Sequence, residues 1–292
     1  MPSGPETTAA DLAQGVEMGK INDGYFSSPV MAAAFVDLAI RPLLDGLGPV
    51  VRHASFGGGE GFLARQIVAA IEASGRTCHA MVVDANPEFL AIAAKSGLET
   101  LCAPLEEIEL EGLDLVTMRS VNHYNAPAAQ RRILERILAA LKPGGHLATQ
   151  NLSGPSAAYC AMVSTIARLT ELGRVAEDSQ VPHIAYDDEF NGFMVDAGFA
   201  DVRVVGRVPE IEVGPAYYWA RFNGLQHKAS LDNHDVHAAI HTRQRAYMAR
   251  ANAIIDDYRA TAPGDDAAPL RPLGRSWVVP LWYPVHVGRR PA

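Results

Sequence analysis

The chain has 292 residues, 48% of them apolar and 20% charged, with a formal net charge of −8 when histidine is neutral. These values are typical of a globular protein that buries its own core, and the excess of acidic residues argues against binding to a nucleic-acid backbone. The three cysteines form no CxxC metal site and suit a reducing compartment. No leader or membrane-length apolar run is visible, so we expect a cytoplasmic protein that binds neither nucleic acid nor membrane.

The first part of the chain, residues 11–47, has the apolar spacing of helices, and strand and helix patterns alternate from residue 48 onward. Short apolar runs predict strands at residues 50–56, 80–83, 113–118 and 146–151. Helices are predicted between them, at residues 62–75, 86–97 and 128–141. Repeated strand–helix units indicate an α/β fold with a doubly wound, mostly parallel sheet and helices on both faces.

The alternation pauses after Gly154 and then resumes. Further elements are predicted as helices at 156–177 and 187–197 and a strand at 202–208. An insertion at 212–276 then interrupts the sheet with an aromatic cluster and a helix near 234–260, before a last strand at 277–287. We expect the core to comprise residues 48–211 and 277–292. We expect the insertion to form a helical and aromatic cap over a substrate, with an oligomer interface as the alternative.

A glycine cluster, GGGEG, follows the first predicted strand. Gly57, Gly59 and Gly61 permit positive φ angles and a close approach of the backbone to a ligand. Asp84 ends the next strand, where a carboxylate can accept hydrogen bonds from both ribose hydroxyls of an adenosine ligand. Taken alone, the glycines also fit a tight strand–helix turn, and Asp84 also fits a surface aspartate in a turn. Together the two features favour a nucleotide-type site.

Five segments resemble, in order and spacing, the successive motifs of class I S-adenosylmethionine-dependent methyltransferases that act on small molecules. They read VVRHASFGGGEG, MVVDANPEFL, LDLVTMRSVNHYN, ILAALKPGGHLATQNLS and FMVDAGFADVRVV. The likeness covers roughly residues 48–209 and the final strand. It implies a Rossmann-like core that binds S-adenosyl-L-methionine and an N-terminal helical lid at residues 1–47.

The resemblance also assigns cofactor-binding positions residue by residue. The glycine loop lies against the methionine part and the adenosine, Asp84 holds the ribose, and a lid residue covers the methionine end. The cofactor-binding residues so implied are Tyr25, Gly57, Gly58, Gly59, Gly61, Asp84, Ala85, Asn86, Ala103, Pro104, Leu105, Arg119, Ser120 and Val121. Two positions depart from the family pattern: Ser55 and Ala103 stand where an acidic residue is usual.

The catalytic and substrate residues are expected on either side of the cofactor. His123 follows the fourth strand and is the candidate general base, with Tyr124 beside it, although packing alone also explains His123. The insertion is expected to supply an aromatic wall and a cation for a substrate carboxylate: Tyr217, Tyr218, Trp219 and Arg221. Arg119 is a second candidate for that cation. His234, His237 and His241 share one helix face, which we interpret as a solvated or hydrogen-bonded helix edge, with a transition-metal site as the alternative.

The predicted activity is in-line methyl transfer to O, N or C of a small organic molecule in specialised metabolism. Two alternatives stay open. One is an S-adenosylmethionine-consuming cyclase or alkyl transferase that releases methylthioadenosine, and the other is an inactive cofactor-binding partner subunit. A homodimer also stays open.

Overall fold

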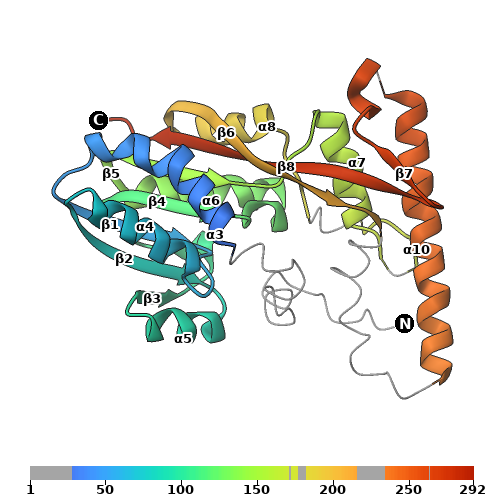
Figure 1. The fold of residues 1–292 in the computed structure, drawn as a ribbon, viewed down its shortest axis with the longest axis horizontal. Helices are drawn as coiled ribbons and strands as arrows, with labels where there is room; N and C mark the ends of the chain where they lie inside the picture. Colours follow the sequence, from blue (N-terminus) through green and yellow to red (C-terminus); the bar gives the residue numbers. More distant parts are fainter. Residues whose placement is uncertain (1–27, 171, 177–181, 216–233, 263) are drawn as a thin grey trace.

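The computed structural model describes residues 28–170, 172–176, 182–215, 234–262 and 264–292 (Figure 1). Its middle layer is one sheet with the strand order β3-β2-β1-β4-β5-β8-β6. The parallel strands are β1 (Val50–Phe56), β2 (Thr77–Asp84), β3 (Glu99–Cys102), β4 (Leu113–Arg119) and β5 (Leu141–Gln150). The antiparallel strands are β6 (Ala200–Val213), β7 (Arg271–Leu273) and β8 (Ser276–Arg289). The predicted α/β fold with a mostly parallel sheet is confirmed.

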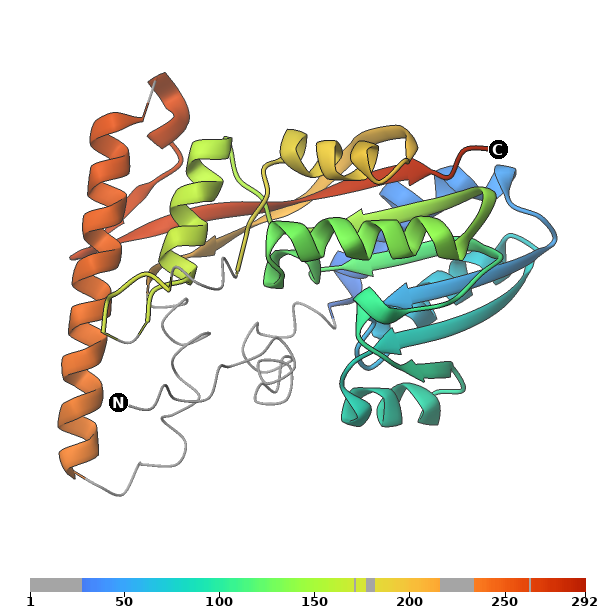
Figure 2. The same ribbon diagram turned by 180° about the vertical axis from the view of Figure 1, so that it is seen from behind.

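Helices cover both faces of the sheet, as Figures 1 and 2 show from opposite sides. One face carries α3 (Pro29–Phe35), η2 (Val36–Ile40), η3 (Arg41–Gly46) and α4 (Phe62–Ala73). The other face carries α6 (Pro127–Ala140) and α8 (Asp187–Asp196). The helix α5 (Pro87–Lys95) packs beside β2 and β3. Its start follows the predicted signal, because the Asn86 side chain accepts a hydrogen bond from the Glu88 amide and Pro87 takes the first helical position.

The described part of the expected N-terminal lid packs as core. Ser28 caps α3, and Phe35 and Ile40 are fully buried. This helical run lies against α4 and against β6 and β8. Residues 29–46 are therefore a layer of the sheet's own packing. Residues 1–27, with Tyr25, lie outside the described residues.

The insertion packs on a long extension of the sheet. Strands β6 and β8 have 14 residues each, and β8 pairs with β5 only from Val285 to Arg289. The remainder of β8 reaches α7 (Ala157–Ala167) and α10 (His234–Thr261), at the end of the molecule away from the C-terminus (Figure 2). Buried tyrosines hold this end together: the Tyr159 hydroxyl donates to Pro280 O and the Tyr247 hydroxyl to Ile166 O, both at 2.9 Å. Within the described ranges, none of the helices combines the length and apolar character that a membrane crossing needs.

Candidate functional site

The glycine loop turns sharply out of β1 toward the end of β2. The amides of Gly57 and Gly58 donate to Val83 O at 2.7 and 3.2 Å. Gly57, Gly59 and Gly61 have φ angles of +62°, +53° and +75°, and Gly61 is the N-cap of α4. A residue with a Cβ atom would be strained in these left-handed conformations. The backbone at these three positions therefore favours glycine.

The four glycines differ in what surrounds them. A Cβ on Gly57 would collide with Val121, one on Gly58 would lie 2.7 Å from Ser55 Oγ, and one on Gly61 would lie 2.6 Å from Leu98 Cδ1. On Gly59 the nearest protein atom would be Cδ2 of Phe89, at 3.9 Å. Three glycines are thus required by the protein's own packing, whereas Gly59 has an open side on which a ligand can approach closely.

Asp84 joins the glycine loop to α5. Its carboxylate accepts a hydrogen bond from the Gly59 amide on Oδ2 and from the Asn86 amide on Oδ1, both at 2.9 Å. The Ala103 amide donates to Asp84 O at 3.2 Å, which brings the segment after β3 to the same edge. Pro104 and Leu105 continue from there into η4 (Leu105–Glu107). The structure thus gathers the glycine loop, Asp84 to Asn86 and Ala103 to Leu105 at the carboxyl ends of β1, β2 and β3.

The segment after β4 lies against the glycine loop. Ser120 is buried and has a φ of +57°, which is rare without glycine, and its amide donates to Gln150 O at 2.8 Å. The Val121 side chain contacts Gly57. His123 lies in η5 (Asn122–Tyr124), is only 7% exposed and stacks at a tilt on Tyr124, with ring centroids 4.2 Å apart. The segment after β4 thus lies beside the glycine loop that follows β1.

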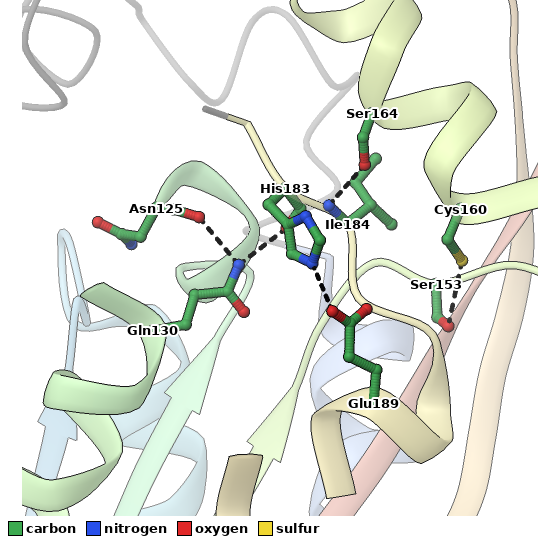
Figure 3. A network of polar contacts seen from close by, with 8 residues as sticks. All are labelled: Asn125, Gln130, Ser153, Cys160, Ser164, His183, Ile184 and Glu189. Carbon is green, nitrogen blue, oxygen red and sulfur yellow. Dashed lines mark hydrogen bonds and ion pairs between the residues drawn. The ribbon is translucent and has the colours of Figure 1, made fainter. Parts of the chain in front are cut away.

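A clamp of hydrogen bonds holds the His123 segment (Figure 3). Nε2 of the buried Gln130 donates to Asn125 O and to His183 O, both at 2.9 Å. The His183 amide donates to His123 O at 3.1 Å, and the next amide, of Ile184, donates to Ser164 Oγ of α7 at 2.8 Å. His183 also contacts Glu189 at 3.0 Å, and this hydrogen bond lowers the pKa of the Glu189 carboxyl. The loop after β4, α6 and α7 are therefore joined through the segment 183–184.

Several buried polar atoms near the ends of β4 and β5 have no hydrogen-bond partner in the described part of the chain. They are Ser120 Oγ, both side-chain polar atoms of Asn122, both side-chain polar atoms of Gln150, and Asn151 Oδ1. Such atoms are costly unless a ligand or water completes them. The sequence analysis missed Asn122, Gln150 and Asn151, although polar residues directly after apolar strands were a visible signal.

A buried histidine lies beneath the site and was also not predicted. His53 Nε2 contacts Thr117 Oγ1 at 2.9 Å across β1 and β4. Burial lowers the pKa of His53 to about 3, because the charged form cannot be solvated there. His53 is therefore neutral at physiological pH and serves the core of the sheet.

Most of the remaining predicted side chains are not described by the structure, and a separate recess lies apart from the predicted site residues. The predicted substrate residues lie outside the described residues: Tyr217, Tyr218, Trp219 and Arg221. The side chains of the three histidines at 234, 237 and 241 are likewise not described. Arg119 is the last residue of β4 and is partly buried. A recess of about 210 Å³ beside His146 and Arg289 contains none of the predicted site residues.

Comparisons with known proteins agree with this geometry. Residues 54–147 match the profile of a family described as a methyltransferase domain. No curated protein sequence matches the chain significantly. Among solved structures, the YcgJ protein of Bacillus subtilis has a TM-score of 0.59 at 12% identity and covers 90% of this chain and 98% of its own. A Bacillus halodurans C-125 protein provisionally classed as a methyltransferase has a TM-score of 0.60 at 13% identity, with coverages of 89% and 99%.

A third solved structure comes from a nematode. It is phosphoethanolamine N-methyltransferase 2 of Haemonchus contortus in complex with S-adenosyl-L-methionine, with a TM-score of 0.53 at 15% identity. The match covers 100% of this chain and 62% of that one. At such identities the likeness is one of fold. The family match supports the resemblance that the motifs indicated over residues 54–147.

Proposed function

We propose that this chain is a class I S-adenosylmethionine-dependent methyltransferase and that it transfers a methyl group to a small organic acceptor, which the methyltransferase-domain match at residues 54–147 supports. The observation that carries the proposal is the Asp84 bridge. One carboxylate holds both Gly59, whose outer side is open, and the cap of α5. This is a preformed cradle for a nucleoside at the carboxyl ends of parallel strands, where ligands of such sheets bind.

The residues around the cradle suit S-adenosyl-L-methionine. Each oxygen of Asp84 accepts one main-chain hydrogen bond and retains capacity for a ribose hydroxyl. Ala85, Asn86 and the segment from Ala103 to Leu105 would flank the adenine. The main chain from Arg119 to Val121 would face the methionine end. Ser55 lies beneath Gly58 and offers a hydroxyl where the family usually has a carboxylate, so we expect weaker charge pairing with the cofactor ammonium.

When bound, the cofactor supplies a methyl group made electrophilic by its sulfonium. The protein then has to hold the acceptor in line with that methyl and exclude water. His123 is proposed to take a proton from the acceptor where its nucleophilic atom carries one. Its clamped main chain suits that role, because a base acts only if it stays within hydrogen-bond reach of the proton. Tyr124 would shape the same wall.

Calorimetry with S-adenosylhomocysteine tests the cofactor site. Asp84→Ala removes charge-assisted hydrogen bonds worth roughly 1.5–3 kcal/mol each, so its dissociation constant should rise at least about tenfold. Asp114→Asn is the control, because the Asp114 carboxylate likewise accepts a main-chain hydrogen bond, from Arg52, near the start of β4, although Asp114 is buried and Asp84 is half-buried. Equal affinity in the wild type and a folded Asp84→Ala protein would refute the site.

Analysis of the co-product separates methyl transfer from the second enzyme reading. Adenosylhomocysteine indicates methyl transfer, whereas methylthioadenosine indicates cyclisation or alkyl transfer. The serine at position 55 is the observation that keeps the second reading in view, because it alters the surroundings of the aminobutyrate part of the cofactor. Tight nucleotide binding without either product across a broad acceptor panel would favour a partner subunit.

A further inference from the structure

Gln150 is a fully buried carboxamide at the end of β5, and among the described residues neither its Nε2 nor its Oε1 has a hydrogen-bond partner. A carboxamide in that state is expensive, since burial removes its water and nothing in the described structure replaces it. An apolar side chain of the same volume would fit the sheet better. The position therefore carries a polar group whose partner comes from outside the fold.

Strand register shows which side of the sheet Gln150 occupies. Gln150 pairs with Arg119 on β4, and Thr117, two residues earlier, pairs with Ser55 on β1. Register partners and alternate residues point to the same face of a sheet. Ser55 in turn lies under Gly58 of the glycine loop. Gln150 thus stands on the same face as the loop, two strands further along.

Its place in the strand order separates Gln150 from the cofactor cradle. The cradle uses the ends of β1, β2 and β3 and the segment after β4, whereas β5 lies on the far side of β4 from β1. A ligand group that reaches Gln150 is therefore on the acceptor side of the predicted methyl position. The orientation of the cofactor used here rests on the proposed function, whereas the observation that Gln150 lacks partners among the described residues is independent of it.

The chemistry of the side chain selects the ligand group. A carboxylate or phosphate would satisfy only Nε2 and would leave Oε1 facing another acceptor. An ammonium would satisfy only Oε1. A neutral group with a donor beside an acceptor satisfies both atoms. We propose that Gln150 forms an acceptor subsite for a neutral carboxamide, lactam or hydroxy-carbonyl group.

The test compares two buried substitutions in β5. Gln150→Met removes the donor and acceptor at nearly constant volume. Thr149→Val is the matched control, because Thr149 is equally buried and its side chain lies on the opposite face of the strand, where Oγ1 accepts from Asn151 Nδ2 at 3.3 Å. Without ligand, Gln150→Met should melt at the wild-type temperature or above it, while Thr149→Val should melt lower.

Ligand-observed NMR then measures binding of acetamide, propionamide and benzamide against their matched carboxylates and amines, with and without adenosylhomocysteine. The amides should bind the wild type best and should lose at least about fivefold in affinity in Gln150→Met, with less than about twofold change in Thr149→Val. The proposal is overturned if a charged probe binds better or no amide binds. It is also overturned if Gln150→Met keeps amide affinity or melts below the wild type.

Failure of the proposed function would look different. A wild-type chain that does not bind adenosylhomocysteine contradicts the cofactor site. The melting temperatures and the amide affinities measured without nucleotide would still test the proposed Gln150 subsite independently.

Discussion

The ends of β1 and β2 and the ends of β4 and β5 are built in opposite ways. At the first pair the chain completes its own polar groups: Val83 O receives two glycine amides, and both oxygens of Asp84 accept main-chain hydrogen bonds. At the second pair Ser120 adopts a left-handed conformation, and the carboxamides of Asn122 and Gln150 are buried without a hydrogen-bond partner in the part of the chain that the structure describes. The chain itself shapes the first half of the site, and we expect a ligand to complete the second half.

The difference suggests a division of labour in binding. A preformed cradle loses little conformational freedom on binding and suits a ligand that is always the same. Unpartnered polar groups reject ligands that leave them unsatisfied, so they provide selectivity between acceptors. We expect substitutions in the first half to change nucleotide affinity and those in the second half to change turnover.

The largest expected effect is at Gly59, in the preformed half. Gly59→Val should weaken adenosylhomocysteine binding by at least about a hundredfold, since a branched side chain fills the open side of the loop and strains a left-handed backbone. Gly75→Val is the matched control, because Gly75 also has a positive φ and no neighbour within 4 Å. Both variants should lose similar stability by thermal melting. Normal binding by Gly59→Val would reduce GGGEG to a structural turn.

His123 tests the other half. His123→Ala should lower turnover on the order of 10²-fold for an acceptor that must lose a proton, and should leave nucleotide affinity within about threefold. A histidine base also predicts an acidic limb in the pH–rate profile. Unchanged turnover, or a flat profile from acid to neutral pH, would leave His123 as a packing residue.

Gln130 should act on turnover through the main chain around His123. Gln130→Met removes the two hydrogen bonds that the Gln130 side chain contributes to the clamp and should lower turnover about tenfold, with nucleotide affinity again within about threefold. Asn191→Leu is the control. It removes the hydrogen bond between Asn191 Oδ1, in α8, and His286 Nδ1, in β8, whose length is 2.9 Å. If the loss of turnover is explained in both variants by the decrease in melting temperature, the clamp has no specific role.

A last effect, on the free energy of unfolding and not on binding or turnover, concerns the buried histidines His53 and His286. Burial holds the pKa of His53 at about 3 and that of His286 at about 4, against about 6.5 in an unfolded chain. The unfolded state therefore takes up protons first as the pH falls. Each histidine's contribution is complete above about pH 6.5 and declines by about 1.4 kcal/mol per pH unit below it, until its folded pKa is reached.

Urea unfolding between pH 6 and pH 4.5 measures that slope. His53→Gln keeps a donor for Thr117 and removes the titration, so its free energy of unfolding should fall by about 1.4 kcal/mol less per pH unit than that of the wild type. Parallel slopes for the two proteins would mean that His53 is solvated in the native state.

The parts that the sequence predicted well are those whose signals are local. Each of these signals depends on the backbone at its own position: glycines with positive φ, an aspartate at a strand end and an Asn-Pro helix start. The strand at 50–56 also has the predicted bounds. The helical run at 29–46, part of the lid expected at residues 1–47, packs against α4 and the sheet, and amphipathic spacing alone does not reveal which surface such a run covers. β3 was missed, because its four half-exposed residues are held by pairing with β2.

The missed site residues depend on long-range contacts. Gln130 is significant only because Asn125 O and His183 O lie within reach, and those atoms come from different parts of the chain. Gln150 stands out only when its surroundings are seen to lack a partner. No local pattern distinguishes such carboxamides from ordinary ones.

The position of β8 has a consequence for synthesis of the protein. Residues 276–289 fill the place between β5 and β6, both of which leave the ribosome earlier. At about 5–20 residues per second, the stretch from residue 213 to residue 276 takes roughly 3 to 13 s to translate. During that time β5 and β6 each present an open edge to other nascent chains. Completion of the sheet must await one late, distant strand, and the edge of β5 stays open at least until translation has passed Arg289, the last residue of β8 that pairs with β5.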